Sequence, residues 1–294
     1  MLSSLLAFAI TVPLGLDTYI PTPEDNPLTA AKIALGRALF EDKALSRDRS
    51  VSCATCHVAS YAFSDKQPVA VGLEGRKGDR RAPSILNRAY GKSFFWDGRT
   101  KTLEEQVLLP ITNPKEMDLS LEEAVARLGA YRGRFAEAFQ AEVSAKTLAY
   151  ALASYVRSIL AGNSAYDRYM AGDGGALSAA ALRGLRLFRG KAGCLACHVG
   201  TNFTDERLHN TGAGKSDAAG RFKTPTLRNV AAHPPYMHDG SVGTLEAVID
   251  FYNDGGKAGA NLDPEIRKLG LSAVEKAELL EFLRSLTGEV RHGN

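Results

Sequence analysis

A five-residue motif occurs twice in the chain and constrains the fold more than any other feature. Cys53-Ala54-Thr55-Cys56-His57 has a counterpart in Cys194-Leu195-Ala196-Cys197-His198. C-x-x-C-H is the attachment signature of a c-type haem: two thiols three positions apart can form thioethers with one porphyrin, and the adjacent histidine can ligate its iron. The motifs use all four cysteines. The sequence therefore predicts two covalently bound haem c groups.

Other roles for paired cysteines explain the sequence less well. Two C-x-x-C pairs can form a zinc site with four thiolates, a thioredoxin-like pair needs a βαβ context, and an exported protein can contain disulfides. None of these arrangements explains why a histidine follows each pair. We therefore favour haem c over zinc, redox-active thiols or disulfides.

Composition and hydrophobic patterning set the broad class of protein. The chain has 294 residues, 45% of them hydrophobic, which is enough for two haem domains with their own cores. A formal net charge of +3 gives no support to nucleic-acid binding. Alternating strand patterns are scarce, so the predicted fold class is mainly α.

Helical spacing and a glycine-rich break predict how the chain is divided. The expected helices are Thr29–Phe40, Leu103–Leu109, Leu119–Gly129 (with Ser120 near its start), Lys146–Leu160, Ser178–Phe188 and Glu275–Leu286. A break at Gly172-Asp173-Gly174-Gly175 separates two expected domains. The boundaries are 1–26 for an apolar segment and lead-in, 27–170 for a first haem domain and 171–294 for a second.

The first residues of the chain have features of an export signal. Leu5 to Leu16 is apolar and about as long as a signal-peptide h-region, although it lacks a Lys/Arg n-region and a clear cleavage site. Three interpretations stay open for it: an incomplete signal, a short anchor or the start of a mature chain. Tyr19 to Asn26 is a proline-rich, extended lead-in. Because haem c is attached outside the bacterial inner membrane, we expect a periplasmic protein with an incomplete or atypical signal. No later segment is expected to span a membrane.

An internal repeat surrounds the two motifs. The matched residues are Gly36 with Gly184, Phe40 with Phe188, Pro83 to Asn87 with Pro225 to Asn229, Asp97-Gly98 with Asp239-Gly240, and Leu103-Glu104 with Leu245-Glu246. The spacing from the proline to the leucine is identical in both halves. The repeat predicts two cytochrome c-like haem domains related by internal duplication, facing each other about a pseudo-twofold axis.

The repeat also predicts a chemical difference between the two haems. Seven residues beyond the shared leucine lies Pro110 in the first half and Tyr252 in the second. If this position faces the iron, proline leaves the first haem open to peroxide or oxygen, whereas a phenol can ligate the second iron and suit it to electron storage. The alternative is that Tyr252 is an ordinary half-buried aromatic residue.

Several longer motifs resemble those of one protein family. They are Phe95-Trp96-Asp97-Gly98-Arg99, Leu103-Glu104-Glu105-Gln106, Pro110-Ile111, Pro114-Lys115-Glu116-Met117 and Thr224-Pro225-Thr226-Leu227-Arg228-Asn229. From about Leu35 to Gly256 the chain resembles the bacterial dihaem cytochrome c peroxidases and their MauG-like relatives. The resemblance implies two periplasmic cytochrome c-like domains, with one peroxidatic and one electron-transferring haem.

The resemblance also implies catalytic residues. Gln106 and Glu116 match the distal pocket pair of the first haem, and Trp96 matches a tryptophan between the haems. A carboxylate in a desolvated pocket can move the proton that peroxide cleavage requires, and an amide can orient the bound oxygen. Taken without the resemblance, Glu116 and Gln106 would be surface residues and Trp96 a core residue.

The chain departs from the peroxidases at both haems. Many of them have a distal histidine after the first motif, but no histidine lies between His57 and His198. The first haem is therefore expected to be open without reductive activation. Tyr252 stands where the peroxidases have a methionine ligand, as in the MauG-like branch, and it favours ferric iron. Met237 is a rival ligand that we expect to pack against its own loop instead.

A third departure concerns calcium, which is usual between the domains of this family. The asparagine that partly holds the ion is matched here by Arg81, a poor neighbour for Ca²⁺. We expect calcium to be weak or absent, with Arg81 standing in for its charge. Among the other histidines, His209 and His292 are expected in solvent, His233 and His238 in structural roles.

These observations predict a dihaem c-type peroxidase that reduces hydrogen peroxide at the first haem. Electrons would come from a small cytochrome c or cupredoxin through the second haem. The alternative is a MauG-like enzyme that uses peroxide-derived high-valent iron to oxidise residues of a partner protein. A different class of function is an electron-transfer or haem sensor module, although a relay needs no pair such as Gln106 and Glu116. A homodimer is left open.

Overall fold

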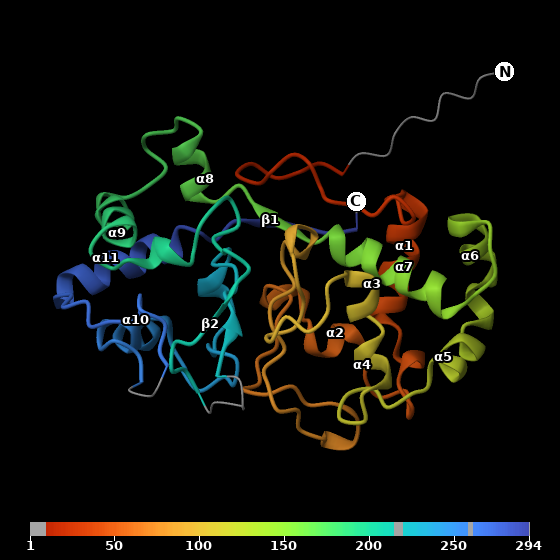
Figure 1. Ribbon diagram of the computed structural model, residues 1–294. Helices are drawn as coiled ribbons and strands as arrows, with labels where there is room; N and C mark the ends of the chain where they lie inside the picture. The colour runs from red at the N-terminus through yellow and green to blue at the C-terminus, as the bar shows by residue number, and fades with distance from the viewer. Residues whose placement is uncertain (1–9, 215–219, 258–260, 294) are drawn as a thin grey trace.

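Two groups of helices lie side by side in the computed structural model, which describes residues 10–214, 220–257 and 261–293 (Figure 1). The first group contains α1 (Ala30–Glu41), α2 (Cys53–Cys56), α3 (Leu103–Gln106), α4 (Leu109–Thr112), α5 (Leu121–Arg127), α6 (Arg132–Phe139) and α7 (Ala145–Arg157). The second contains α8 (Ala165–Met170), α9 (Ala179–Arg189), α10 (Leu245–Asn253) and α11 (Ala273–Arg284). The predicted mainly α class is confirmed.

Two small antiparallel sheets join distant parts of the chain. β1 (Leu160–Gly162) pairs with β4 (Glu289–Arg291), and β2 (Leu208–His209) pairs with β3 (Phe222–Lys223). Figure 1 shows β1 between the two helical groups. The pairing of β1 with β4 therefore joins the end of the first group to the C-terminal residues.

Polar caps and one proline explain where several helices begin. Thr29, Ser120 and Ser178 accept hydrogen bonds from the first turns of α1, α5 and α9, as N-cap hydroxyls do. The helix expected at Leu103–Leu109 ends earlier, at Gln106, and a separate short helix, α4, follows with Pro110 in its first turn, where a missing backbone N–H is tolerated. The sequence did not predict α6, α8 or α10, which have 8, 6 and 9 residues.

Each helical group is built on one close pair of helices. α1 packs against α7, and α9 packs against α11. A Cβ on Gly36 would lie 1.9 Å from the carbonyl oxygen of Ala151, and one on Gly184 would lie 2.0 Å from that of Glu278. Only glycine allows these helices to approach so closely. The repeated glycine therefore has the same packing role in both groups.

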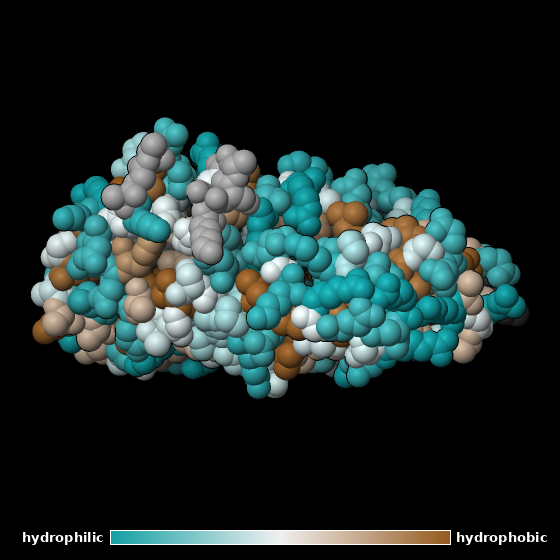
Figure 2. All heavy atoms as spheres, turned by 90° about the horizontal axis from the view of Figure 1, so that it is seen from below, coloured by the Kyte–Doolittle hydropathy of each residue, from teal (hydrophilic) through white to brown (hydrophobic). Residues whose placement is uncertain are grey.

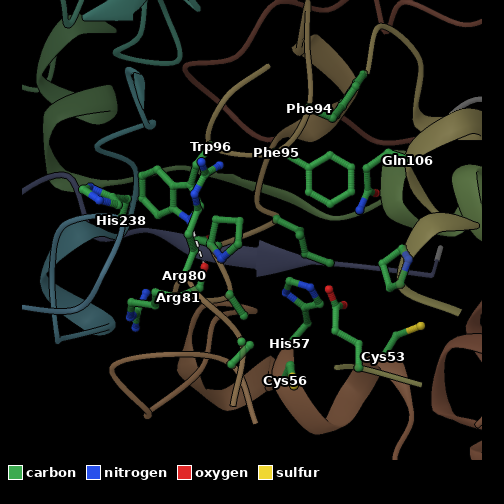
Figure 3. A pocket seen from close by; sticks show the side chains of 18 of the residues that line it. Cys53, Cys56, His57, Arg80, Arg81, Phe94, Phe95, Trp96, Gln106 and His238 are labelled. Carbon is green, nitrogen blue, oxygen red and sulfur yellow. Dashed lines mark hydrogen bonds between the residues drawn. The ribbon is translucent and has the colours of Figure 1, made fainter. Parts of the chain in front are cut away.

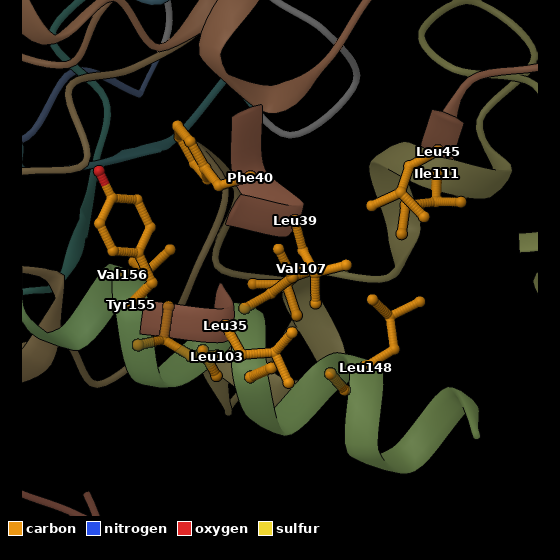
Figure 4. Close-up of a cluster of buried hydrophobic side chains, with 14 of the residues drawn as sticks. Leu35, Leu39, Phe40, Leu45, Leu103, Val107, Ile111, Leu148, Tyr155 and Val156 are labelled. Carbon is orange, nitrogen blue, oxygen red and sulfur yellow. The ribbon is translucent and has the colours of Figure 1, made fainter. Parts of the chain in front are cut away.

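The hydrophobic core is divided in the same way. Figure 4 shows part of the first cluster, in which Leu35 and Leu39 of α1 lie near Leu148 of α7. In the second cluster the rings of Phe188 and Phe282 are 5.0 Å apart. Each group thus buries its own apolar faces, which allows each to support a separate site.

Two matched asparagines stabilise equivalent turns. Asn87 and Asn229 have φ values of 58° and 55°, in the left-handed region that asparagine tolerates. The Asn87 side chain hydrogen-bonds both backbone groups of Ala161 (2.7 and 3.0 Å), and that of Asn229 does the same with Gly288 (3.1 and 3.2 Å). The repeated motif therefore adopts the same local geometry twice.

Residues 10–26, the N-terminal arm, run along both helical groups before α1 (Figure 1). Leu16 is buried in a small apolar cluster. The guanidinium of Arg228 donates to the carbonyl oxygen of Gly15 (2.7 Å), and the Tyr90 hydroxyl donates to a carbonyl oxygen of the arm (2.7 Å). The arm therefore makes specific contacts with both halves of the protein.

These contacts change the interpretation of the apolar N-terminal stretch. The part from Ile10 to Leu16 packs against the folded body, which is not expected of a segment that is removed after export. Leu5 to Ala9 lie outside the described residues. The described part of this stretch therefore belongs to the folded body, and the signal-like role of Leu5 to Leu16 stays a prediction.

Helix length and surface character bear on contact with a membrane. No helix among the described residues is both long and apolar enough to cross a bilayer. The face in Figure 2 is mostly hydrophilic, with hydrophobic side chains scattered over it rather than gathered in one continuous patch.

Candidate functional site

The first Cys-x-x-Cys-His motif forms one short helix and the residue after it. α2 begins at Cys53, where the backbone N–H of Ser52 donates to Thr55 Oγ1 (2.9 Å). His57 ends the helix, with its Nδ1 3.1 Å from the carbonyl oxygen of Phe63. Donation from Nδ1 to a carbonyl orients the ring and leaves Nε2 as the metal-binding nitrogen.

A cavity of about 1000 Å³ connects this motif with the predicted distal residues. Its lining includes Cys53, Cys56 and His57 together with Gln106 and Glu116. Figure 3 shows Gln106 across the cavity from His57. The volume is at the upper end of the range for small-molecule and cofactor sites. The position, size and donor set of the cavity fit a covalently attached haem.

Glu116 lies in a place where its carboxyl group can exchange a proton. Burial raises the pKa of this carboxyl, although a hydrogen bond from Asn113 and the charge of Arg99 act in the opposite direction. Asn113 Nδ2 donates to Glu116 Oε1 at 2.6 Å. Asn113 was not among the predicted site residues. Its position three residues before Glu116 is the one sequence feature that could have indicated this contact.

Trp96 lies where the two halves meet. Its indole Nε1 donates to the carbonyl oxygen of Arg81 (2.8 Å), and its own carbonyl oxygen accepts from the backbone N–H of Lys223 (2.7 Å). Its ring is 6.5 Å from that of His238 in an edge-on arrangement, and both line the cavity (Figure 3). Trp96 thus joins the first cavity to residues of the second half.

His238 and Met237 also lie on the cavity side of this interface. His238 is buried and stacks on Phe222, with ring centroids 3.6 Å apart and an interplanar angle of 15°. This packing agrees with the structural role predicted for it. Met237 lines the cavity of the first motif, together with Trp96 and His238. Tyr252 and Met237 therefore both stay candidate ligands of the second iron, with Tyr252 the predicted one.

The second motif has a similar proximal arrangement. Cys194 opens a single helical turn, and the Nδ1 atom of His198 lies 2.9 Å from the carbonyl oxygen of Phe203. Burial lowers the pKa of His198, as it does for His57. Low pKa values keep both imidazoles in the neutral form that binds metals. The two histidines are therefore prepared for ligation in the same way.

Tyr252 lies on α10, in the second helical group. Burial raises the pKa of its phenol to about 12, although a hydrogen bond with Thr211 acts in the opposite direction. The thiols of Cys194 and Cys197 are close enough to influence this phenol electrostatically. Tyr252 is therefore near the second motif, and its role as a ligand of the second iron stays a prediction.

The four cysteines form no disulfide in this structure. Burial raises the pKa of Cys53, Cys56 and Cys194 to about 12 and that of Cys197 to about 11. Among the described residues, the only group of side chains close enough to share a metal ion contains one cysteine, Cys197. A four-thiolate zinc site is therefore excluded.

Two histidines were expected in solvent but are partly buried. His209 lies between Asp205 (2.8 Å) and Asp263 (2.5 Å). Burial alone lowers the pKa of His209, but the hydrogen bonds to these carboxylates raise it overall. His292 lies 3.2 Å from the hydroxyl of Tyr155. Both expectations are wrong, because Asp263 and Tyr155 come from distant parts of the chain. His233 lines the cavity, and its ring nitrogens have no hydrogen-bond partner among the described residues.

Two c-type attachment motifs, each supported by its own helical group, define a di-haem c-type protein. The family model described as di-haem cytochrome c peroxidase matches residues 30–175. The chain belongs to the di-haem cytochrome c peroxidase family, whose members are oxidoreductases with haem c cofactors.

Three similar proteins illustrate the range of this family. Methylamine utilization protein MauG of Methylorubrum extorquens is 43% identical over 289 residues, covering 92% of this chain and 82% of the relative. Cytochrome c551 peroxidase of Nitrosomonas europaea is 33% identical over 290 residues, covering 92% and 84%. The crystal structure of a MauG-like protein associated with microbial copper homeostasis has a TM-score of 0.86 at 36% identity, covering 93% and 95%.

Proposed function

We propose that the protein reacts with hydrogen peroxide at the first haem and that Trp96 passes oxidising equivalents to the second. The main support is one cavity lined by the first attachment motif, by Glu116 and by Trp96. A purely electron-transferring site has no need of a half-buried carboxyl group with a raised pKa. The same cavity therefore combines cofactor attachment, proton transfer and a route to the other half.

The residues of the chain have separate roles in this reaction. When bound, haem c supplies the iron at which peroxide is reduced. The Glu116 carboxylate takes the proton from the near oxygen of peroxide and returns it to the far oxygen, which leaves as water. The Gln106 amide donates a hydrogen bond that orients the bound oxygen. Overall, peroxide accepts two electrons and two protons and yields two molecules of water.

For the use of these oxidising equivalents, we favour a MauG-like reaction in which residues of a partner protein are oxidised. The supporting observation is that Tyr252 lies near the thiols of the second motif. A phenolate ligand stabilises oxidised iron, which suits a centre that stores oxidising equivalents. The 43% identity to a protein named MauG is consistent with this choice.

The second candidate is a peroxidase that takes electrons from a small cytochrome c or cupredoxin through the second haem. Its support is the relatives named as cytochrome c peroxidases, among them one that is 33% identical. Both candidates use the first site in the same way. They differ in whether electrons come from a soluble donor or from residues of a protein substrate.

One experiment separates these functions. The oxidised di-haem protein is mixed with one equivalent of peroxide, without prior reduction, and both haem spectra are followed. We expect both spectra to change and the oxidised state to persist in the absence of a donor. Rapid multiple turnover with a reduced cytochrome c or cupredoxin would favour the peroxidase. A requirement for prior reduction would contradict the open first haem.

We also propose the wider architecture that the sequence suggested. Matched glycines, asparagines and attachment motifs support internal duplication into two haem domains. The sequence predicted 27–170 and 171–294, but Tyr166 and Tyr169 of α8 pack against the second hydrophobic cluster, so we propose that the second domain begins before α8. Attachment of haem c favours the periplasm. A homodimer stays a prediction, to be tested by light scattering of the di-haem protein.

A further inference from the structure

We propose that Arg81 is a built-in cation that joins the two halves and positions Trp96, in place of an interdomain calcium ion. The role of Trp96 rests on the proposed function, whereas the replacement of the metal does not. Arg81 is buried, with an exposed fraction of only 3%.

The Arg81 guanidinium binds oxygen atoms from both halves. In the first half, Nη1 donates to Ser64 Oγ (2.6 Å) and Nη2 donates to the carbonyl oxygen of Asp65. In the second half, Nη2 also donates to the carbonyl oxygens of His233 (2.9 Å) and Pro234 (3.3 Å). One positive charge is thus surrounded by oxygen atoms from two segments far apart in the sequence.

This arrangement does not fit a calcium ion. Calcium requires six to eight oxygen ligands and no cation beside them. Here the guanidinium takes up the carbonyl and hydroxyl oxygens that an ion would need. Arginine presents its donors in a planar fork, so one side chain can hold several oxygens without a metal. The expectation that calcium is weak or absent therefore has a structural basis.

The backbone of Arg81 holds the interface in the same place. Its carbonyl oxygen accepts the indole N–H of Trp96 (2.8 Å), and its own N–H donates to the carbonyl oxygen of His238 (2.7 Å). The guanidinium reaches Ser64, which follows Phe63, the residue whose carbonyl oxygen orients His57. Arg81 therefore connects the proximal loop of the first haem with Trp96 and the second half.

The contacts give Arg81 a positioning role rather than a catalytic one. Loss of the guanidinium would remove the donor that four oxygen atoms share and would loosen the backbone that holds the indole. Transfer of oxidising equivalents depends on a fixed path between the centres, so it should slow even where both haems remain attached.

The first test is made on the wild-type di-haem protein. Its metal content is measured after purification, and its melting temperature and visible spectrum are recorded with and without excess EGTA. We expect less than one-tenth of an equivalent of calcium, about a tenfold deficit relative to one ion per chain, and no change on chelation. One tightly held calcium per chain, or a shift with EGTA, would overturn the proposal.

The second test compares Arg81→Asn with Arg81→Lys. We expect Arg81→Asn to lower the melting temperature and to gain a calcium-dependent rise, because a neutral oxygen donor then replaces the cation. Arg81→Lys keeps the charge but loses the fork, so its melting temperature should fall without a response to calcium. Arg284→Asn, an exposed substitution on α11, is the matched control.

Peroxide kinetics test the positioning role separately. In Arg81→Lys we expect the first haem spectrum to change at the wild-type rate and the second about tenfold more slowly. Equal rates at the second haem would refute the positioning role. If peroxide does not react with the wild-type protein, the proposed function is contradicted. The metal measurements still test whether Arg81 replaces calcium. If Arg81→Asn does not fold, the chelation experiment and Arg81→Lys decide it.

Discussion

The two halves of this protein prepare a haem-binding histidine in the same way but place different side chains opposite it. His57 and His198 both use Nδ1 to contact a phenylalanine carbonyl oxygen. The first half adds Glu116 to its cavity, whereas the second half has Tyr252 near the thiols of its motif. The comparison teaches that a repeated scaffold can keep its attachment chemistry while the opposite face of each site determines reactivity.

The strongest test of this difference is to remove the carboxyl group from the first site. Glu116→Gln should slow the reaction with peroxide by about 10²–10⁴-fold, because general acid–base catalysis contributes on that order. Stopped-flow absorbance of the oxidised protein measures this rate. Haem content should not change, and exposed Glu105→Gln is the matched control. An unchanged rate of reaction with peroxide would mean that Glu116 does not give the first site its reactivity.

The next test examines what the halves share. Gly36→Ala and Gly184→Ala should each lower the free energy of unfolding by about 1–3 kcal/mol, because the new Cβ would collide with a backbone oxygen of the partner helix. Denaturant titration of the di-haem protein gives this quantity. Gly133→Ala in α6, where nothing lies within 4 Å of a new Cβ, should not destabilise the protein. A lower free energy of unfolding in only one of the two variants would contradict the structural equivalence of the two helix pairs.

A third test concerns the candidate ligand of the second haem. Tyr252→Met should raise the reduction potential of that haem by more than about 59 mV, a tenfold change in the one-electron equilibrium, because methionine favours the reduced state more than a phenolate does. Redox titration measures the shift. Tyr169→Met, a tyrosine of α8, is the control. No change in spectrum or potential would mean that Tyr252 does not bind the iron.

The smallest expected effect concerns the pH dependence of the first site. Asn113→Ala removes a hydrogen bond that lowers the pKa of Glu116. The pKa should rise further, so the carboxylate needed as a base would be lost at higher pH. The acid limb of the pH–rate profile should therefore move upward by about one unit, or ~1.4 kcal/mol. Lys115→Ala is the control, and a downward shift would contradict this role for Asn113.

Some features of the fold followed from local sequence and others did not. The N-cap positions of Thr29 and Ser178 were predictable because the capping hydroxyl is adjacent to its helix. The helix predicted for Leu103–Leu109 ends three residues earlier, and α4, with Pro110 in its first turn, was not predicted. A buried arm and a signal segment have similar composition, so the apolar stretch ending at Leu16 did not reveal its contacts with the folded body.

The sequence by itself determined that the chain carries two haem attachment sites, because Cys-x-x-Cys-His acts through neighbouring residues. The repeat also indicated the contrast between Pro110 and Tyr252. Only the tertiary structure decided that Glu116 shares a cavity with the first motif, and that Arg81 binds oxygens of Ser64 and His233. These relationships depend on contacts between residues distant in the chain, which local spacing does not specify.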